Sequence, residues 1–287
     1  MNDLRQCTHK NLYLINDLRF NLADIGKLEQ IVSRSDMSDL EWEFIKCVLP
    51  NKSRGVKRVD DRRVINGIFY VLKAGCPWRD LPGQYGPYTT VYNRFNRWSR
   101  AGIWDTVPEA VADAHNSNTV MVDGTSIRVH HSGATLKKTD PRRCMGRSRG
   151  GLTTKIHAVV NQTGLPIRFH LTPGQDHDAP PCKVLLDELQ PGQSVLADKA
   201  YDADWIRNMI WEQGAIAVIP SKSNRKIPRE FDAELYKQRN LIERFFGRIK
   251  ASFRRIATRY EKTSQNFMAM IKLAAVRLWC QFYESAA

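Results

Sequence analysis

The hydrophobic pattern of this 287-residue chain changes its period near residue 116. Before that point, apolar residues recur at helical spacing. After it, short apolar runs typical of buried strands alternate with helical segments. The expected helices are 37–49, 60–73, 89–100, 178–189, 204–213 and 236–256, and the expected strands are 119–123, 155–160, 165–172, 194–198 and 215–220. This order predicts a helical region followed by a mixed α/β sheet with flanking helices.

Composition and local signals exclude several classes of protein. The chain is 42% hydrophobic and 26% charged, as ordinary globular domains are. No apolar run approaches the ~18 residues of a membrane span, and Met1–Lys10 is polar and mixed in charge, unlike a signal peptide. The six cysteines are widely spaced without a CxxC pair, which indicates reduced thiols. We therefore expect a soluble, cytoplasmic protein with no membrane partner.

The positive charge of the chain is concentrated in two windows. Residues 137–155 carry a net charge of +6 and residues 221–262 a net charge of +8, which together equal the +14 of the whole chain. A charge run is often only a solvated face. Two such clusters in a chain with a pI of about 9.6 favour a polyanionic partner, above all nucleic acid.

Two places suggest how nucleic acid would be contacted. Arg94 and Arg97 lie on the polar face of the helix 89–100, which suits a DNA groove and a plain solvated face equally well. The loop from 60–73 to this helix is too long for a standard helix-turn-helix, whose turn has about 3–4 residues. Arg147 and Arg149 lie in the glycine-rich run GRSRGG, which suits a loop that contacts phosphates.

Two aspartates each end a buried apolar run. Asp123 follows VMV and Asp198 follows SVLA. A carboxylate at the tip of a buried strand is rigidly held and suits a hard metal ion. A helix N-cap suits either residue as well, so both interpretations stay open from these residues alone.

A third acid lies in the segment YKQRNLIERFFGRIK. If this segment is one helix, Tyr236, Arg239, Glu243 and Lys250 share an arc of about 60° beside the apolar face. Arg239 and Glu243 would then form an ordinary i, i+4 salt bridge. A lone acid among cations also fits a metal ligand beside a phosphate-binding track.

The remaining polar candidates are expected to be structural. These are the histidines at 130, 131, 157 and 177, of which His177 with Asp178 is the least ordinary, and the acids Asp176, Asp178, Asp202 and Asp204, which we interpret as caps or surface residues.

These motifs together resemble the bacterial insertion-sequence transposases of the DDE type, in the insertion sequence 5 superfamily and its 427 subgroup. Tyr236, Arg239, Glu243 and Lys250 match the Y-(2)-R-(3)-E-(6)-K pattern of that superfamily. The segments LADKAYD and VDGTSI are similar to those around its second and first catalytic aspartates. GIFYVLKAGCPWRDLP, TVYNRFNRWSRAGIW and TPGQDHD are similar to family segments too, so that the resemblance covers about residues 37–280.

The resemblance implies a ribonuclease-H-like core with a mixed five-stranded sheet. It also implies that Asp123, Asp198 and Glu243 are catalytic and bind two divalent ions, Mg²⁺ with Mn²⁺ as a substitute. In two-metal chemistry one ion activates the attacking oxygen and the other stabilises the leaving oxygen. Tyr236, Arg239 and Lys250 would contact DNA phosphates or position Glu243.

We therefore expect a transposase that cuts the ends of an insertion sequence and joins them to target DNA. Its partners would be terminal inverted repeats and target DNA, bound as a homodimer, in a bacterial cytoplasm at the nucleoid. The expected organisation is an extension of unknown role (1–36), a helical DNA-binding region (37–115) and the catalytic domain (116–283). The alternatives are a metal-dependent nuclease without strand transfer and a DNA-binding repressor derived from a transposase.

Overall fold

The architecture comes from a computed structural model, which describes residues 35–50, 59–105, 117–137 and 139–286. The chain divides into two compact units. One contains the chain up to Ala114 together with Phe253–Arg255 and Ala269–Ala287; the other contains His115–Ser252 and Ile256–Met268. The second unit begins at His115, and the segment from Ala269 belongs to the first, helical unit. Most of the expected extension 1–36 lies outside the described residues.

The described part of the helical unit contains the three helices that the sequence predicts and a C-terminal one. They are α2 (Asp39–Lys46), α3 (Asp61–Ala74), α4 (Tyr88–Arg100) and the part of α11 (Ser264–Ala286) that follows Met268, with the 3₁₀ turns η2 (Trp78–Asp80) and η3 (Gly83–Tyr85). Ser38 and Glu41 form the capping box that starts α2. Asp60 caps α3, and Gly75 ends that helix at φ +71°, a left-handed conformation that glycine adopts without strain.

The core of the helical unit is mostly apolar but includes a buried ion pair. Ile65, Phe69 and Phe95 are among its fully buried side chains. Glu41 is also buried, and its Oε1 forms an ion pair with Nε of Arg277 on α11 at 3.1 Å. Burial raises the pKa of Glu41, although Arg277 opposes the rise. This ion pair joins the C-terminal helix α11 to α2 of the same unit.

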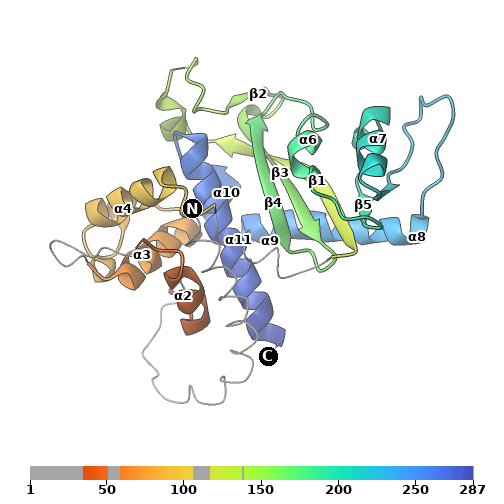
Figure 1. Cartoon of the computed structure of the whole chain (residues 1–287). Coiled ribbons are helices and arrows are strands. Elements are labelled where there is room, and N and C mark those ends of the chain that lie inside the picture. Colours follow the sequence, from red (N-terminus) through yellow and green to blue (C-terminus); the bar gives the residue numbers. More distant parts are fainter. Residues whose placement is uncertain (1–34, 51–58, 106–116, 138, 287) are drawn as a thin grey trace. The chain divides into compact units, whose positions relative to one another are not determined.

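The α/β unit contains a mixed sheet in which β1 is central (Figure 1). Its strands are β1 (Thr119–Val129), β2 (Gly146–Ser148), β3 (Gly151–Asn161), β4 (Pro166–Pro173), β5 (Ser194–Leu196), β6 (Ile216–Val218) and β7 (Thr258–Arg259). The order β4-β3-β1-β5-β6 forms the core, with β3 and β4 antiparallel and β5 and β6 parallel to their neighbours. Two short strands extend the five that were expected: β2 pairs with β3, and β7 pairs with β1.

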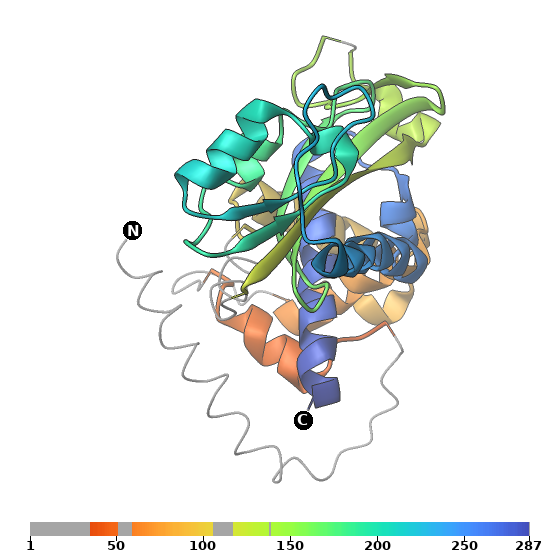
Figure 2. The ribbon, with the colours of Figure 1, turned by 90° about the vertical axis from the view of Figure 1, so that its right-hand side faces the viewer.

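Helices cover the two faces of this sheet. They are α6 (Cys182–Leu185), α7 (Asp204–Glu212), α8 (Ala233–Tyr236) and α9 (Asn240–Ser252), with the 3₁₀ turns η4 (His131–Thr135), η5 (Lys199–Tyr201) and η6 (Lys237–Arg239). The division between the two units falls within the short α10 (Arg254–Ala257). Val120 and Val122 of β1 join a core cluster with residues of α6 and α7. Figure 2 shows α9 on the other side of the sheet from α7. Because side chains alternate along a strand, Asp123 and Thr125 face α9.

Two expected helices differ from the structure. The segment 178–189 forms only the short α6, which begins after Pro180 and Pro181, because a proline disfavours the helical conformation of the residue before it. The segment 236–256 is divided into α8, η6, α9 and α10, so Tyr236 and Arg239 precede the regular helix. The face shared by Arg239 and Glu243 survives this division, since the two side chains still form an ion pair.

Two absences apply to the described part of the chain. None of the five cysteines there forms a disulfide. No helix there is both long and apolar enough to cross a membrane.

Candidate active site

The two aspartates belong to neighbouring parallel strands but are placed differently from each other. Asp198 follows the end of β5, as expected, whereas Asp123 lies within β1, which continues past it to Val129 and therefore does not end there. Met121 of β1 is paired with Leu196 of β5, and Asp123 and Asp198 each follow two residues later. Side chains two residues apart in a strand point to the same face of a sheet, so Asp123 points to the face that α9 covers. Asp198 lies close enough to interact electrostatically with both Asp123 and Arg239. Asp198 also caps η5, because its Oδ1 accepts a hydrogen bond of 2.8 Å from the backbone N–H of Ala200. The cap and the strand-end interpretations are therefore compatible at this residue.

Asp123 is a largely buried carboxylate with two hydrogen bonds. Its Oδ1 accepts from the backbone N–H of Gly124 at 2.7 Å, and its Oδ2 accepts from Nη1 of Arg239 at 3.0 Å. Burial raises the pKa of Asp123, and the nearby negative charge of Asp198 raises it further, against the lowering effect of Gly124 and Arg239. The two aspartates are thus close enough to repel each other, and a cation between them would relieve that repulsion.

Arg239 connects this pair to the third acid. Its Nη1 contacts Asp123, and its Nη2 contacts Oε1 of Glu243, which follows four residues later on α9. The guanidinium also lies against the ring of Tyr236, 5.9 Å from its centroid. Burial lowers the pKa of Arg239, but the carboxylates of Asp123 and Glu243 outweigh it and the net shift is upward. Arg239 is therefore a partly buried, charged bridge between two acids from distant parts of the chain.

Lys250 reaches the same strand from the other end of α9. Its Nζ donates a hydrogen bond of 2.6 Å to Oγ1 of Thr125, two residues beyond Asp123. Burial lowers the pKa of Lys250. The sequence pattern of Tyr236, Arg239, Glu243 and Lys250 thus corresponds to one face of a helical segment lying along β1.

The expected triad is only partly assembled in this structure. Within the described residues, no group of three or more His, Cys, Asp or Glu side chains is close enough to hold a metal ion. Asp123 and Asp198 interact with each other, whereas Glu243 joins Asp123 through Arg239 and is more exposed, at 58% of its side chain.

The other predicted DNA contacts are distributed over both units. In the helical unit, Arg97 is exposed, but Arg94 is mostly buried, pairs with Asp61 and lies over the ring of Trp98. In the α/β unit, Arg147 on β2 and Arg149 in the turn after it are both exposed. Arg97, Arg147 and Arg149 are therefore available to a ligand, and Arg94 has a structural role.

Sequence reasoning missed a buried polar cluster behind Asp123, on the opposite face of β1. His157 of β3 is fully buried, its Nε2 lies 2.8 Å from Oγ1 of Thr172, and its Nδ1 has no hydrogen-bond partner. Oδ1 of Asp178 lies 3.9 Å from that Nδ1, and it accepts a hydrogen bond of 2.9 Å from Nζ of Lys155. Burial lowers the pKa of His157 to about 4, so the imidazole is neutral at physiological pH. The segment TPGQDHD was the only sequence signal for this cluster.

Asp202 was expected to be a cap or a surface residue, and the structure places it elsewhere. Its side chain is fully buried, not on the surface, and it accepts hydrogen bonds of 2.8 Å from Arg207, Arg225 and the backbone N–H of Lys222. Nothing in the spacing of DKAYD indicates these partners, which lie up to 23 residues away.

Comparison with family models gives two matches that together cover most of the chain. Residues 37–107 match the putative transposase of the IS4/5 family, and residues 115–279 match the transposase DDE domain. The chain is 43% identical over 129 residues to a putative transposase for insertion sequence element IS6501 from Brucella ovis, covering 45% of this chain and 98% of the relative. It is 34% identical over 119 residues to a 16.2 kDa protein of insertion element IS402 from Burkholderia cepacia, covering 37% of this chain and 81% of that protein.

A solved structure supports the architecture. The piggyBac transposase in its synaptic complex with hairpin DNA superposes with a TM-score of 0.51 at 11% identity, covering 86% of this chain and 71% of the other. At that identity the likeness concerns the fold alone. It confirms the expected ribonuclease-H-like core, a mixed sheet with flanking helices.

Proposed function

This chain belongs to the DDE transposases of insertion sequences, enzymes that act on DNA, and from that premise we propose that it cuts the ends of an insertion sequence and joins them to target DNA. The joining step would be a transesterification, in which a 3′-hydroxyl displaces a phosphodiester oxygen. The observation that carries the proposal is the bridge by Arg239 between Asp123 and Glu243, with Asp198 beside Asp123. The finer placement in the 427 subgroup stays a prediction.

The donor atoms fit divalent ions. Asp123, Asp198 and Glu243 offer carboxylate oxygens, the ligands that Mg²⁺ and Mn²⁺ prefer. The mutual repulsion of the two aspartates and the guanidinium that already bridges two of the acids both indicate a site that attracts positive charge. We propose that these three residues hold two such ions. When bound, the ions would activate the attacking oxygen and stabilise the leaving oxygen.

The chain's own residues would bind and orient the DNA. The guanidinium of Arg239 and the ammonium of Lys250 lie on either side of Glu243 along the helical segment, so both can meet phosphates of a strand that reaches Asp123. Tyr236 packs against Arg239 and restricts its orientation. Asp123 lies in β1 and Asp198 follows β5, so the pairing of these two strands sets the positions of both carboxylates. The phosphate that reacts beside these carboxylates would therefore be positioned by the sheet.

Further DNA contacts would come from exposed cations. We assign phosphate contacts to Arg97 in the helical unit and to Arg147 and Arg149 in the α/β unit, because their side chains are exposed. Binding of two element ends calls for two copies of the chain, so we propose a homodimer on DNA carrying terminal inverted repeats.

A marked mini-element on a plasmid tests the function. It would carry the DNA that flanks the gene, and excision and joining would be scored with the wild type, Asp198→Asn and Glu243→Gln. The proposal expects joined products from the wild type and none from either variant, while all three retain DNA binding in a gel-shift assay. Cutting without joining would favour a nuclease. DNA binding without any cutting by the wild type would favour a repressor.

A further inference from the structure

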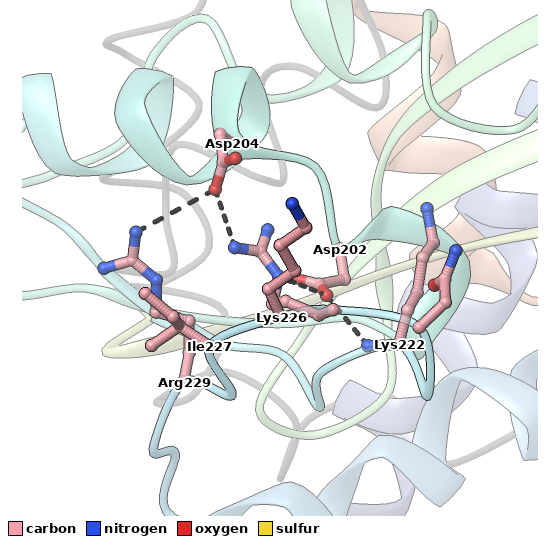
Figure 3. A pocket seen from close by; sticks show the side chains of 8 residues that line it. Asp202, Asp204, Lys222, Lys226, Ile227 and Arg229 are labelled. Carbon is pink, nitrogen blue, oxygen red and sulfur yellow. Dashed lines mark hydrogen bonds and ion pairs between the residues drawn. The ribbon is translucent and has the colours of Figure 1, made fainter.

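The loop between β6 and α8 forms a basic hollow that the proposed active site does not use. The hollow has a volume of about 570 Å³ and is open to solvent (Figure 3). Its lining consists of Asp202, Asp204, Lys222, Asn224, Arg225, Lys226, Ile227 and Arg229. Four of these residues are cations and two are acids, so the hollow is basic overall.

Buried Asp202 holds this loop in place. It accepts hydrogen bonds from Nε of Arg225 and from the backbone N–H of Lys222, both at 2.8 Å. Arg207 of α7 completes the arrangement, since it bonds to Asp202 at 2.8 Å and to the backbone carbonyl of Ile219 at 2.7 Å. Arg225 also pairs with Asp204 at 2.8 Å. The charge of Arg225 is therefore balanced by two acids of the protein itself, and these contacts hold the base of the loop.

The remaining cations of the hollow are available. Lys222 and Lys226 have no side-chain hydrogen bond or ion pair with any other residue in the described part of the chain, and Lys226 is exposed. Arg229 approaches Asp204 only to 3.9 Å. Between these cations, Ile227 exposes 76% of its surface. Ile227 can therefore contact an apolar part of a ligand whose anionic part is bound by these cations.

The hollow is tied to the proposed active site by a single short turn. Asp198 begins η5 and Asp202 follows its end. Tyr201, within this turn, is fully buried in the core cluster with α6 and α7. The turn therefore fixes the spacing between a proposed catalytic carboxylate and the residue that anchors the loop. A DNA strand that reaches Asp198 would therefore pass near the hollow.

We propose that this hollow binds the sugar-phosphate backbone of DNA beside the reacting phosphate. Lys222 and Lys226 pair with a backbone phosphate, and Ile227 contacts the adjoining sugar or base, as apolar side chains do where proteins distort DNA. A DNA strand fits better than a free nucleotide because the hollow is open and its lining has no aromatic side chain to stack on a base. The inference rests on the proposed function, since it assumes that DNA is the substrate.

Charge-neutral variants test the subsite in the full-length chain. The dissociation constant for a random-sequence DNA duplex would be measured over a range of salt concentrations for the wild type and for Lys222→Gln/Lys226→Gln. The matched control is Lys183→Gln/Lys237→Gln, which removes two exposed cations elsewhere in the same unit. We expect the test variant to bind about tenfold more weakly at low salt and its salt slope to fall by about 1–2, because each phosphate contact releases counterions. The control should keep most of its affinity and slope.

A second pair of variants tests the aliphatic contact. Ile227→Ser should weaken DNA binding several-fold without changing the salt slope, whereas Val184→Ser, on α6 and 54% exposed, should change neither. Urea unfolding midpoints within error of the wild type would show that each variant is folded.

The outcomes separate this inference from the proposed function. If the wild type binds and cuts DNA but the test variant has the same salt slope as its control, the subsite is wrong and the function stands. If the wild type binds no DNA, both fail. If Lys222 and Lys226 change only the binding of inorganic phosphate, measured by thermal shift, the hollow is an anion site that DNA does not use, and the proposal is overturned.

Discussion

Arg239 donates a hydrogen bond of 3.0 Å from Nη1 to Oδ2 of Asp123, which lies 116 residues earlier in the chain. The same guanidinium contacts Glu243. A cation therefore stands between two of the three acids that we propose as metal ligands. Metal ions and the guanidinium would compete for the same oxygens.

Removing this cation should strengthen metal binding in the absence of DNA. Hydrogen bonds to charged groups contribute about 1.5–3 kcal/mol, so Arg239→Gln should bind Mn²⁺ about tenfold more tightly. Isothermal titration calorimetry measures the affinity. The control is Lys237→Gln, which removes an exposed cation paired with Glu234 in the same segment. Equal or weaker Mn²⁺ binding by the Arg239 variant would contradict competition at this site.

Asp202 should make the α/β unit sensitive to acid. Burial alone would raise its pKa, but the N–H of Lys222 and the guanidinium groups of Arg225 and Arg207 hold it at about 2, below the usual 3.8. A lowered pKa in the folded state stabilises the fold above the ordinary pKa and loses that effect as the pH falls toward 2. Asp202→Asn should therefore lower the free energy of unfolding at neutral pH by about 3 kcal/mol, as expected for breaking a buried ion pair.

Urea unfolding from pH 7 downward would measure this effect. The gap between the wild type and Asp202→Asn should narrow as the pH approaches about 2. Asp187→Asn is the control, because Asp187 pairs with Arg168 at a half-exposed position and such pairs contribute at most about 1 kcal/mol. A gap that is independent of pH would show that the charge of Asp202 is not the cause.

Neutralising two arginines of α4 should affect different properties of the protein, stability in one case and DNA binding in the other. Arg94 pairs with Asp61, and both side chains are only 11% exposed. Arg94→Gln should therefore lower the free energy of unfolding by about 3 kcal/mol. Arg97 is exposed, so Arg97→Gln should leave stability unchanged and lower the salt slope of DNA binding by about 1. Chemical denaturation measures the stability of each variant, and fluorescence anisotropy measures its DNA binding. An Arg97→Gln variant that is less stable but binds DNA with an unchanged salt slope would remove Arg97 from the DNA interface.

Gly124, next to Asp123, should tolerate no side chain. A Cβ there would lie 2.9 Å from Nδ1 of His157 and 3.2 Å from Oδ1 of Asp178, both held by hydrogen bonds to other residues or by burial. Gly124→Ala should cost about 1–3 kcal/mol through overpacking and shift Asp123, which would reduce DNA cutting.

Gly247→Ala provides the contrast within α9, one turn after Glu243. A Cβ at this position meets no atom within 4 Å, and alanine favours a helix over glycine by about 1 kcal/mol. This variant should be slightly more stable and equally active. Thermal unfolding together with the mini-element assay would check both, and a stable but inactive Gly247 variant would point to an unrecognised contact there.

Much of the architecture followed from local pattern. The capping box at Ser38 and Glu41, the helices α3 and α4, and the start of β1 all lie where apolar spacing and cap residues placed them, although β1 continues past Asp123 to Val129. These features depend on neighbours within a few residues, so a single sequence contains the information that specifies them. The exceptions were segments in which local signals conflict, such as 178–189 with its paired prolines and the interrupted helix after Tyr236.

The sequence by itself determined which residue types are available for chemistry: three acids at characteristic positions, flanked by Arg239 and Lys250. Only the tertiary structure decided which of them meet. The register of β1 with β5 set Asp123 beside Asp198, and the packing of α9 directed Arg239 and Lys250 to β1. Burial of Asp202 and the unpaired Nδ1 of His157 also depend on long-range contacts. Such contacts join residues far apart in the chain, and their energies come from strand pairing and from excluding water between surfaces, neither of which is present in any local stretch of sequence.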